Sequence, residues 1–189
     1  MEHQPVEIPK RSMRFSLKGF APLWQKQKYA MTNEIDLKFI KEAAEVAMKG
    51  ISENKGGPFG CVIVKDGIVV GRGCNEVISA KDPTAHAEVV AIREACHNLK
   101  SHQLKGCTMY TSCEPCPMCH GAIYWARPDP VVYACTRKDA AAIGFDDDFI
   151  YKEIVLPLDE RQITMHQCGQ ELGLQVFQSW QQKRDKIQY

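Results

Sequence analysis

The chain has 189 residues, of which 44% are hydrophobic and 25% are charged, and its formal net charge is +1. This size and composition are typical of one compact globular domain. The near-neutral charge gives no electrostatic indication of nucleic-acid or membrane-surface binding, and no apolar run approaches the ~20 residues that span a bilayer.

The N-terminal part of the chain, residues 1–33, differs from the rest. Its first 30 residues hold six Lys or Arg against two Glu, with scattered aromatic residues and no sustained period. We therefore expect a basic, flexible extension, followed by a folded domain at 34–189. The extension lacks the apolar stretch of a secretory signal, so we expect a cytoplasmic protein whose nine cysteines are reduced.

The expected elements follow the chain from Asn33, which can cap a helix. A break at 56–60 precedes a β-hairpin with an Asp66-Gly67 turn, and strands then alternate with helices as far as a closing amphipathic helix. The expected strands are 61–64, 68–70, 107–111 and 131–134, and the expected helices are 34–50, 84–98, 118–126, 140–143 and 170–187. This order predicts an α/β layered domain with a mixed sheet, whose ligands bind where strands hand over to helix N-termini.

Two segments at such helix N-termini carry candidate metal ligands. Cys116 and Cys119 form a C-x-x-C pair on the first turn of a helix, where the helix dipole and free N–H groups favour thiolates. Thiolates favour zinc, and His86 can supply a third ligand. Three protein ligands leave one position for water, as in catalytic zinc sites. Glu88 is then placed to take a proton from that water and pass it to a leaving group.

Each of these parts also has a simpler interpretation. A C-x-x-C can be a redox pair or half of a structural zinc site, which Cys113 and Cys107 can complete, and a lone histidine is commonly an ordinary one. The combination is more specific, because His86, Glu88 and residues 115–119 match the H-x-E…P-C-x-x-C signature of the zinc deaminases. The remaining cysteines are interpreted as core or surface thiols.

From Asn33 to Tyr189 the chain resembles the cytidine-deaminase-like superfamily and, within it, the bacterial guanine deaminases. The stretches that carry the resemblance are GGPFG at 56–60, DPTAHAE at 82–88, TSCEPCPMC at 111–119, GAIYWAR at 121–127 and GFDDDFIYKE at 144–153. The resemblance implies a three-layer α/β/α fold with a central mixed five-stranded sheet. It also implies a zinc-dependent enzyme that hydrolyses guanine to xanthine and ammonia.

The resemblance further implies a role for each candidate residue. One Zn²⁺ per subunit is implied to bind His86, Cys116 and Cys119, with Glu88 as the catalytic proton shuttle. The residues implied to contact the purine are Asn75, Phe59, the Ala87 backbone, Asp147 and the C-terminal Tyr189. The implied assembly is a homodimer in which the C-terminal segment can cross to the neighbouring subunit.

The acidic stretch 146–148 bears on the choice of substrate. Its carboxylates suit the donors at N1, N2 and N9 of guanine, although three successive Asp leave the register open and can also form a solvated turn. Other functions stay open: a tRNA adenosine deaminase whose basic tail binds phosphates, a deaminase of guanosine, ammeline or cytosine, or a non-catalytic zinc module. The net charge and the acidic stretch argue against nucleic acid, and Glu88 argues against a purely structural zinc.

Overall fold

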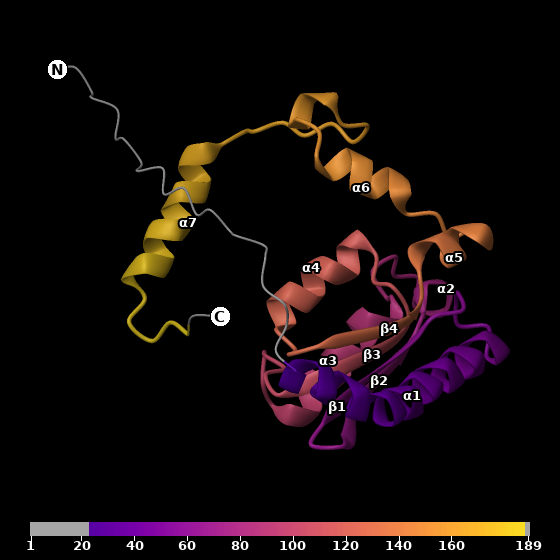
Figure 1. Ribbon diagram of the computed structural model, residues 1–189. Coiled ribbons are helices and arrows are strands. Elements are labelled where there is room, and N and C mark those ends of the chain that lie inside the picture. The colour runs from indigo at the N-terminus through magenta and orange to yellow at the C-terminus, as the bar shows by residue number, and fades with distance from the viewer. Residues whose placement is uncertain (1–22, 188–189) are drawn as a thin grey trace. The chain divides into compact units, whose positions relative to one another are not determined.

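The computed structural model describes the backbone of residues 23–187 and the side chains of residues 34–187 (Figure 1). The chain divides into two compact units, Met1–Asn33 and Glu34–Tyr189, and the site described below lies in the second. Of the flexible extension expected at 1–33, residues 1–22 lie outside the described residues, as does the expected substrate contact Tyr189, whereas residues 23–33 are helical.

A mixed sheet forms the centre of the second unit. Its strands are β1 (Gly60–Lys65), β2 (Ile68–Cys74), β3 (Cys107–Cys113) and β4 (Val131–Cys135), in the order β2-β1-β3-β4. β1 pairs antiparallel with both β2 and β3, whereas β3 and β4 are parallel. The mixed sheet is confirmed, and the four strands predicted from the residues are present.

The five-stranded sheet implied by the resemblance is corrected to four strands in the part of the chain that the structure describes. Directly after β4, Thr136 and Asp139 form a reciprocal capping box that starts a helix. Such a box satisfies the free N–H groups of the first turn and so favours helix over a further strand. The chain then continues through two short helices and a 3-10 turn.

The five predicted helices are present in the predicted order, but their ends differ and two further short helices occur in the described residues. They are α1 (Leu23–Ser52), α2 (Val77–Ala80), α3 (Ala87–Leu99), α4 (Pro117–Ala126), α5 (Arg137–Ala142), α6 (Asp148–Ile154) and α7 (Gln170–Gln182), with a 3-10 turn η1 at Leu158–Glu160. The short α2 and α6 were not expected, and α7 ends before the expected 187. In the described part of the chain, no helix is both long enough and apolar enough to cross a membrane.

α1 begins at Leu23 rather than after the expected cap Asn33. Residues 23–33 contain no Pro or Gly that would end a helix. The helical spacing after Asn33 is therefore the continuation of a longer helix.

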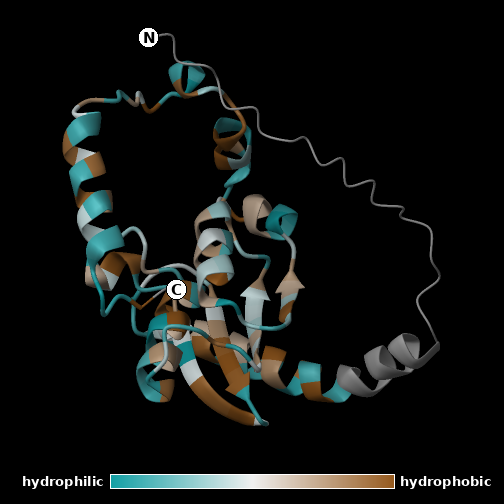
Figure 2. Ribbon diagram, turned by 90° about the vertical axis from the view of Figure 1, so that its left-hand side faces the viewer, coloured by the Kyte–Doolittle hydropathy of each residue, from teal (hydrophilic) through white to brown (hydrophobic). Residues whose placement is uncertain are grey.

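Helices cover both faces of the sheet, so the second unit has three layers (Figures 1 and 2). On one face α1 packs its buried side chains on those of the strands: Phe39, Ala43, Val62, Val64 and Tyr110. On the other face α3 presents a stripe of small residues to larger ones: Ala87, Ala91, Ala95, Cys61, Ile63 and Met109. Burial of these apolar groups on two faces accounts for the brown, hydrophobic segments of the sheet in Figure 2.

The topology also places three helix N-termini at one edge of the sheet. Because β2 and β3 both run antiparallel to β1, and β4 runs parallel to β3, the carboxyl ends of these three strands share an edge. α3, α4 and α5 begin after them. The backbone of α3 packs directly on β2 at Gly73, where there is no room for a side chain. A Cβ at this position would collide with the carbonyl oxygen of Ala87 in the first turn of α3.

Candidate active site

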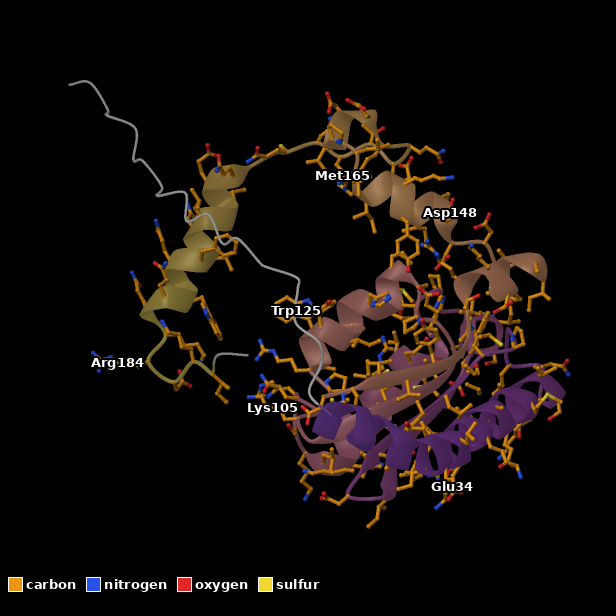
Figure 3. The ribbon with its side chains drawn as sticks, viewed as in Figure 1. Glu34, Lys105, Trp125, Asp148, Met165 and Arg184 are labelled. Atoms are coloured by element: carbon orange, nitrogen blue, oxygen red, sulfur yellow. The ribbon has the colours of Figure 1, made fainter. Side chains whose placement is uncertain are left out.

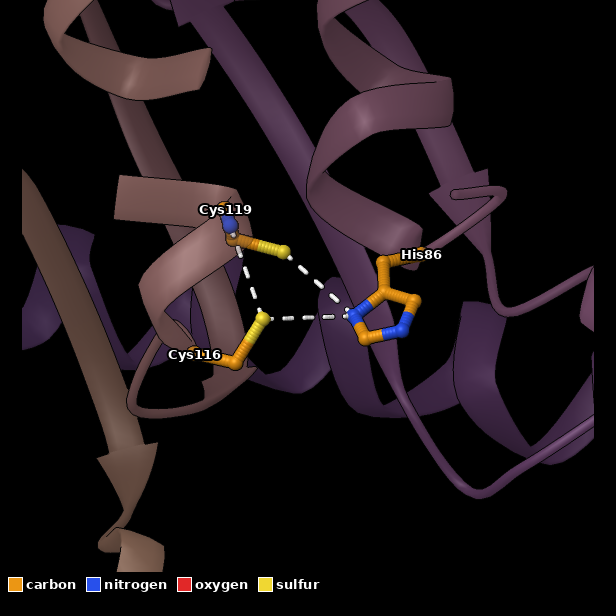
Figure 4. Close-up of side chains that lie close together, drawn as sticks. All are labelled: His86, Cys116 and Cys119. Atoms are coloured by element: carbon orange, nitrogen blue, oxygen red, sulfur yellow. Dashed lines mark hydrogen bonds between the residues drawn. The ribbon is translucent and has the colours of Figure 1, made fainter. Parts of the chain in front are cut away.

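Three potential metal ligands meet at that edge (Figure 4). The His86 Nδ1 atom lies 3.5 Å from the Sγ of Cys116 and 3.5 Å from the Sγ of Cys119. Tetrahedral zinc with ordinary Zn–N and Zn–S bond lengths separates such ligand atoms by about 3.6 Å. The donor set and its spacing therefore fit a Zn²⁺ ion with three protein ligands.

The ends of two helices produce this geometry. His86 occupies the N-cap position of α3 in extended conformation, because residues before it form a turn in which Asp82 accepts hydrogen bonds from the amide and hydroxyl of Thr84. Cys116 is the N-cap of α4, Pro117 follows at its first position, and the Cys119 amide donates to the Cys116 sulfur at 3.5 Å. Both helices therefore direct their positive dipole ends toward the cluster, which stabilises thiolate.

The acidic groups of this cluster favour the binding of a cation. Hydrogen bonding from Cys119, followed by that from His86, lowers the pKa of Cys116. The hydrogen bond with Cys116, burial and the charge of Glu88 raise the pKa of Cys119. Ionisation of Cys116 therefore opposes ionisation of Cys119, and the nearby Glu88 carboxylate adds to this effect. A divalent cation would neutralise the negative charge and stabilise both thiolates.

Glu88 lies beside the ligands on the first turn of α3. Its side chain is buried, with 6% of the residue exposed. One carboxylate oxygen lies 3.3 Å from the Sγ of Cys119, and the other accepts a hydrogen bond of 3.3 Å from the hydroxyl of Thr111 on β3. Burial is the main cause that raises the pKa of this carboxyl. A carboxyl whose pKa is raised by burial is a better proton acceptor than an exposed one, which suits a group that accepts and returns a proton.

A pocket of about 310 Å³ opens in front of Glu88 and the ligands His86 and Cys116. Phe59 lines it and meets Phe145 edge-to-face, with ring centroids 5.0 Å apart. Asn75 also lines the pocket, is 5% exposed, and accepts hydrogen bonds at Oδ1 from the amides of Gly57 and Val77. Because Oδ1 is engaged, its Nδ2 group is the part of Asn75 available to a ligand.

Two residues of the acidic stretch, Asp146 and Asp147, line the pocket from the loop before α6, which begins at Asp148. Asp148, labelled in Figure 3, forms an ion pair of 2.6 Å with Lys152, and Asp146 accepts a hydrogen bond of 2.9 Å from the Asp148 amide. The Asp147 carboxylate makes no hydrogen bond or ion pair with another side chain of the described residues, and Asp147 lines the pocket. These contacts favour Asp147 as the acceptor offered to a ligand.

Most of the predicted site residues therefore surround one pocket. Ala87 is buried at the first position of α3, between His86 and Glu88, and is not among the residues that line the pocket. Cys113, the alternative ligand, stands outside the group of His86, Cys116 and Cys119 whose ligand atoms lie within 4.8 Å of one another.

Several residues that line the pocket or contact Glu88 were not predicted from the sequence. Glu114, Arg137 and Phe145 line the pocket, and Thr111 holds Glu88. Phe145 lies in the stretch that carried the resemblance, so it could have been noticed there. Arg137 gave no signal, because its place depends on the capping box that starts α5.

Comparison with known proteins identifies the class to which this site belongs. Residues 33–135 match the cytidine and deoxycytidylate deaminase zinc-binding region. The chain therefore belongs to this family of zinc-binding deaminases, and it is a hydrolase that acts on C–N bonds.

Within that class the chain is similar to guanine deaminase from Bacillus subtilis (strain 168). The two are 54% identical over 151 residues, which is 80% of this chain and 97% of the relative. The X-ray structure of a Bacillus subtilis guanine deaminase matches with a TM-score of 0.79 and 53% identity over the same shares.

Other relatives are less similar. A structure described for guanine deaminase from Nitrosomonas europaea matches with a TM-score of 0.55 and 33% identity, covering 58% of this chain and 63% of that one. The tRNA-specific adenosine deaminase of Aquifex aeolicus (strain VF5) is 39% identical over 100 residues, which is 53% of this chain and 66% of the relative.

Proposed function

We propose that the chain hydrolyses guanine to xanthine and ammonia, with one Zn²⁺ per subunit bound by His86, Cys116 and Cys119. The observation that carries the proposal is the buried Glu88 carboxylate, 3.3 Å from a ligand sulfur and facing a pocket that Asp147 also lines. The similarity to the Bacillus guanine deaminase supports guanine as the substrate. Cytoplasmic location is part of the proposal, and the free state of all nine cysteines suits a reducing compartment.

Bound zinc supplies the Lewis acidity that makes water nucleophilic near neutral pH. Glu88 does the proton chemistry. Its carboxylate accepts one proton from the attacking water and transfers it to the ring nitrogen next to C2. It then takes the remaining proton from the new hydroxyl on C2 and delivers it to the amine, so that the C–N bond breaks, ammonia leaves and the C2 carbonyl forms. Thr111, which donates to one carboxylate oxygen, helps to orient Glu88, and the other oxygen lies beside the sulfur of Cys119.

Recognition of the base rests on the walls of the pocket. Asp147 accepts from N–H donors of guanine, and Asn75 donates through Nδ2 to an acceptor on the ring. Phe59 packs on the ring, supported edge-to-face by Phe145. The pocket lining is acidic, because it holds the carboxylates of Glu114, Asp146 and Asp147 and only one basic side chain among these polar residues, Arg137. Such a lining disfavours a phosphorylated substrate.

The direct test is the conversion of guanine by zinc-loaded protein, followed through the ultraviolet absorbance of xanthine. Guanosine, adenine and cytosine serve as parallel substrates, and a tRNA with a wobble adenosine serves as the macromolecular one. We expect turnover of guanine alone. Turnover of another amine without guanine would keep the zinc chemistry and overturn the assignment of the substrate.

We further propose a homodimer in which the C-terminal segment reaches the neighbouring subunit and Tyr189 helps to close its pocket. In support of this, α7 exposes an apolar face, with Leu172, Val176, Phe177 and Trp180 each at least 43% exposed (Figure 2). Light scattering should give twice the 21.3 kDa mass of the chain. Deletion of Tyr189 should raise KM for guanine more than it lowers the melting temperature, and an unchanged KM and kcat would refute this role.

A further inference from the structure

Two cysteines outside the metal cluster lie side by side at the pocket edge of the sheet. Cys113 ends β3 and Cys135 ends β4, and they are register partners in the parallel ladder. Register partners on adjacent strands point to the same side, and strand spacing is close to 4.8 Å. That spacing lies within the Cα–Cα range of disulfides.

The sulfur of Cys113 reaches toward the neighbouring strand. It lies 3.6 Å from the carbonyl oxygen of Thr136, the residue that follows Cys135. Burial, followed by the nearby Cys135, raises the pKa of Cys113 to about 11, which agrees with two thiols in close proximity. Both cysteines also line one apolar cavity of about 420 Å³ between α1, α5 and the strand ends.

The two thiols differ in accessibility. Cys135 is exposed, whereas Cys113 is only 7% exposed. A small oxidant therefore meets Cys135 first, and Cys113 is in place to react with the oxidised sulfur. This combination of an accessible thiol with a neighbouring resolving thiol is typical of redox-sensitive pairs.

Cys113 also belongs to the wall of the zinc pocket. The next residue, Glu114, donates its amide to the carbonyl of Cys135 at 2.8 Å and accepts from the Arg137 amide at 3.1 Å. The ligand Cys116 follows two residues later in the same loop. Any movement of Cys113 toward Cys135 therefore changes the pocket wall and the loop that carries a metal ligand.

We propose that Cys113 and Cys135 are a peroxide-sensitive dithiol whose oxidation to a disulfide reversibly lowers activity at the zinc pocket. The Cys135 sulfur attacks hydrogen peroxide, the O–O bond breaks, and a sulfenic acid and water form. The Cys113 sulfur then attacks the sulfenic sulfur, the S–O bond breaks, and the disulfide and a second water form. Two thiols lose two electrons and two protons to one peroxide, and an external dithiol reverses the reaction by exchange.

The bond itself is tested in the zinc-loaded full chain by peptide mapping without reduction after treatment with hydrogen peroxide. Trypsin leaves both cysteines in the fragment that follows Lys105, because Arg127 precedes a proline; additional cleavage before Asp129 separates them. We expect a linked peptide pair in the treated protein that fragmentation assigns to Cys113 and Cys135. Its absence while other cysteines become oxidised would overturn the proposal.

The effect on activity, which rests on the proposed function, is measured in the same samples. Since displacement of a catalytic group by ~1 Å can cost about 100-fold in rate, we expect a loss of about tenfold or more in guanine turnover that dithiothreitol restores. Cys135→Ser, or Cys135→Ala as a second variant, should keep its basal activity and resist peroxide. Cys168→Ser, which removes an exposed cysteine elsewhere, should lose activity as the unmodified chain does.

The outcomes separate the two proposals. If Cys135→Ser is inactivated as fast as the unmodified chain and zinc is released, oxidation of the metal ligands is the cause and the dithiol has no regulatory effect. If the linked peptide forms but the reduced protein deaminates no guanine, the dithiol stands and the proposed function fails.

Discussion

Glu88 is the residue on which the proposed chemistry depends most directly. Glu88→Gln keeps the shape and the capacity to accept from Thr111 but removes the basic carboxylate. We expect zinc content to stay at one per chain and kcat to fall by about 10²–10⁴-fold, the usual contribution of general acid–base catalysis. Metal analysis and guanine turnover on the same sample measure both quantities.

A matched control for this substitution lies on the same helix. Glu94 is exposed on α3, away from the pocket, and accepts a hydrogen bond from the Arg72 amide. Glu94→Gln should therefore retain activity within about twofold. Full activity of Glu88→Gln with a full complement of zinc would show that another group moves the protons.

Tyr110 provides a pH-dependent contribution to stability on the face of the sheet that α1 covers. Its hydroxyl donates to Asp36 at 2.9 Å and its ring lies 5.1 Å from that of Phe39. Burial, then the hydrogen bond to Asp36, raises the pKa of Tyr110 to about 12. A raised folded-state pKa stabilises the protein fully below the unfolded pKa of about 10, and this stabilisation is lost as pH rises from there toward 12.

Tyr110→Phe should consequently flatten the alkaline limb of the stability curve between pH 10 and pH 12. At pH 8 it should cost about 1 kcal/mol, the net value of one hydrogen bond. Urea unfolding at several pH values measures this. Tyr133→Phe, at an exposed tyrosine on β4, is the control, and an equal flattening in both variants would contradict the role of the buried pair.

At the level of elements, the sequence indicated the three candidate metal ligands that the structure brings together, because they form a local pattern. His86 and Glu88 flank the start of one helix, and Cys116 and Cys119 occupy the start of another, so their spacing is readable along the chain. The position of Arg137 in the pocket was not predicted. It depends on the capping box of Thr136 and Asp139, which starts α5 at residue 137 rather than at the expected residue 140. The N-terminal end of α3 was predicted too early, because Asp82 and Thr84 close a turn that competes with helix.

The close packing of α3 on β2 offers a test of how these elements position the site. A Cβ at Gly73 would collide with the Ala87 carbonyl and lie 2.6 Å from the Ala91 amide nitrogen, both in the backbone of α3. Gly73→Ala should therefore displace the start of α3, which carries His86 and Glu88. We expect destabilisation by about 1–3 kcal/mol, as in other overpacked cores, and reduced zinc content, measured by thermal unfolding and metal analysis.

Gly121 on α4 is the matched control, since a Cβ there meets no atom within 4 Å. Gly121→Ala should keep zinc and activity and stabilise the protein by about 0.5–1 kcal/mol, because alanine favours helix more than glycine does. A Gly73→Ala variant with unchanged zinc content and stability would show that α3 tolerates a wider separation from β2.

At the level of the whole molecule, the site exists because distant segments converge. The sequence predicted four strands and a mixed sheet but not the order β2-β1-β3-β4, which depends on long-range pairing. That order places the carboxyl ends of β2, β3 and β4 at one edge, and the pocket draws on Phe59, Asn75 and Asp147 from three separate loops. Their convergence is a property of the topology, and only the resemblance to a family indicated it beforehand.

Because His86 belongs to α3 and Cys116 and Cys119 belong to α4, bound zinc would join two helices from distant parts of the chain. A ligand that binds only the folded state at 1,000 times its Kd stabilises by about 4.1 kcal/mol. For a domain of this size, each kcal/mol shifts Tm by about 2–4 °C, so removing zinc with a chelator should lower Tm by roughly 8–16 °C. Glu88→Gln should show the same decrease, since it keeps all three ligands. An equal Tm with and without metal would mean that the cluster does not bind zinc tightly, whereas a decrease in the unmodified chain alone would make Glu88 part of metal binding rather than of proton transfer.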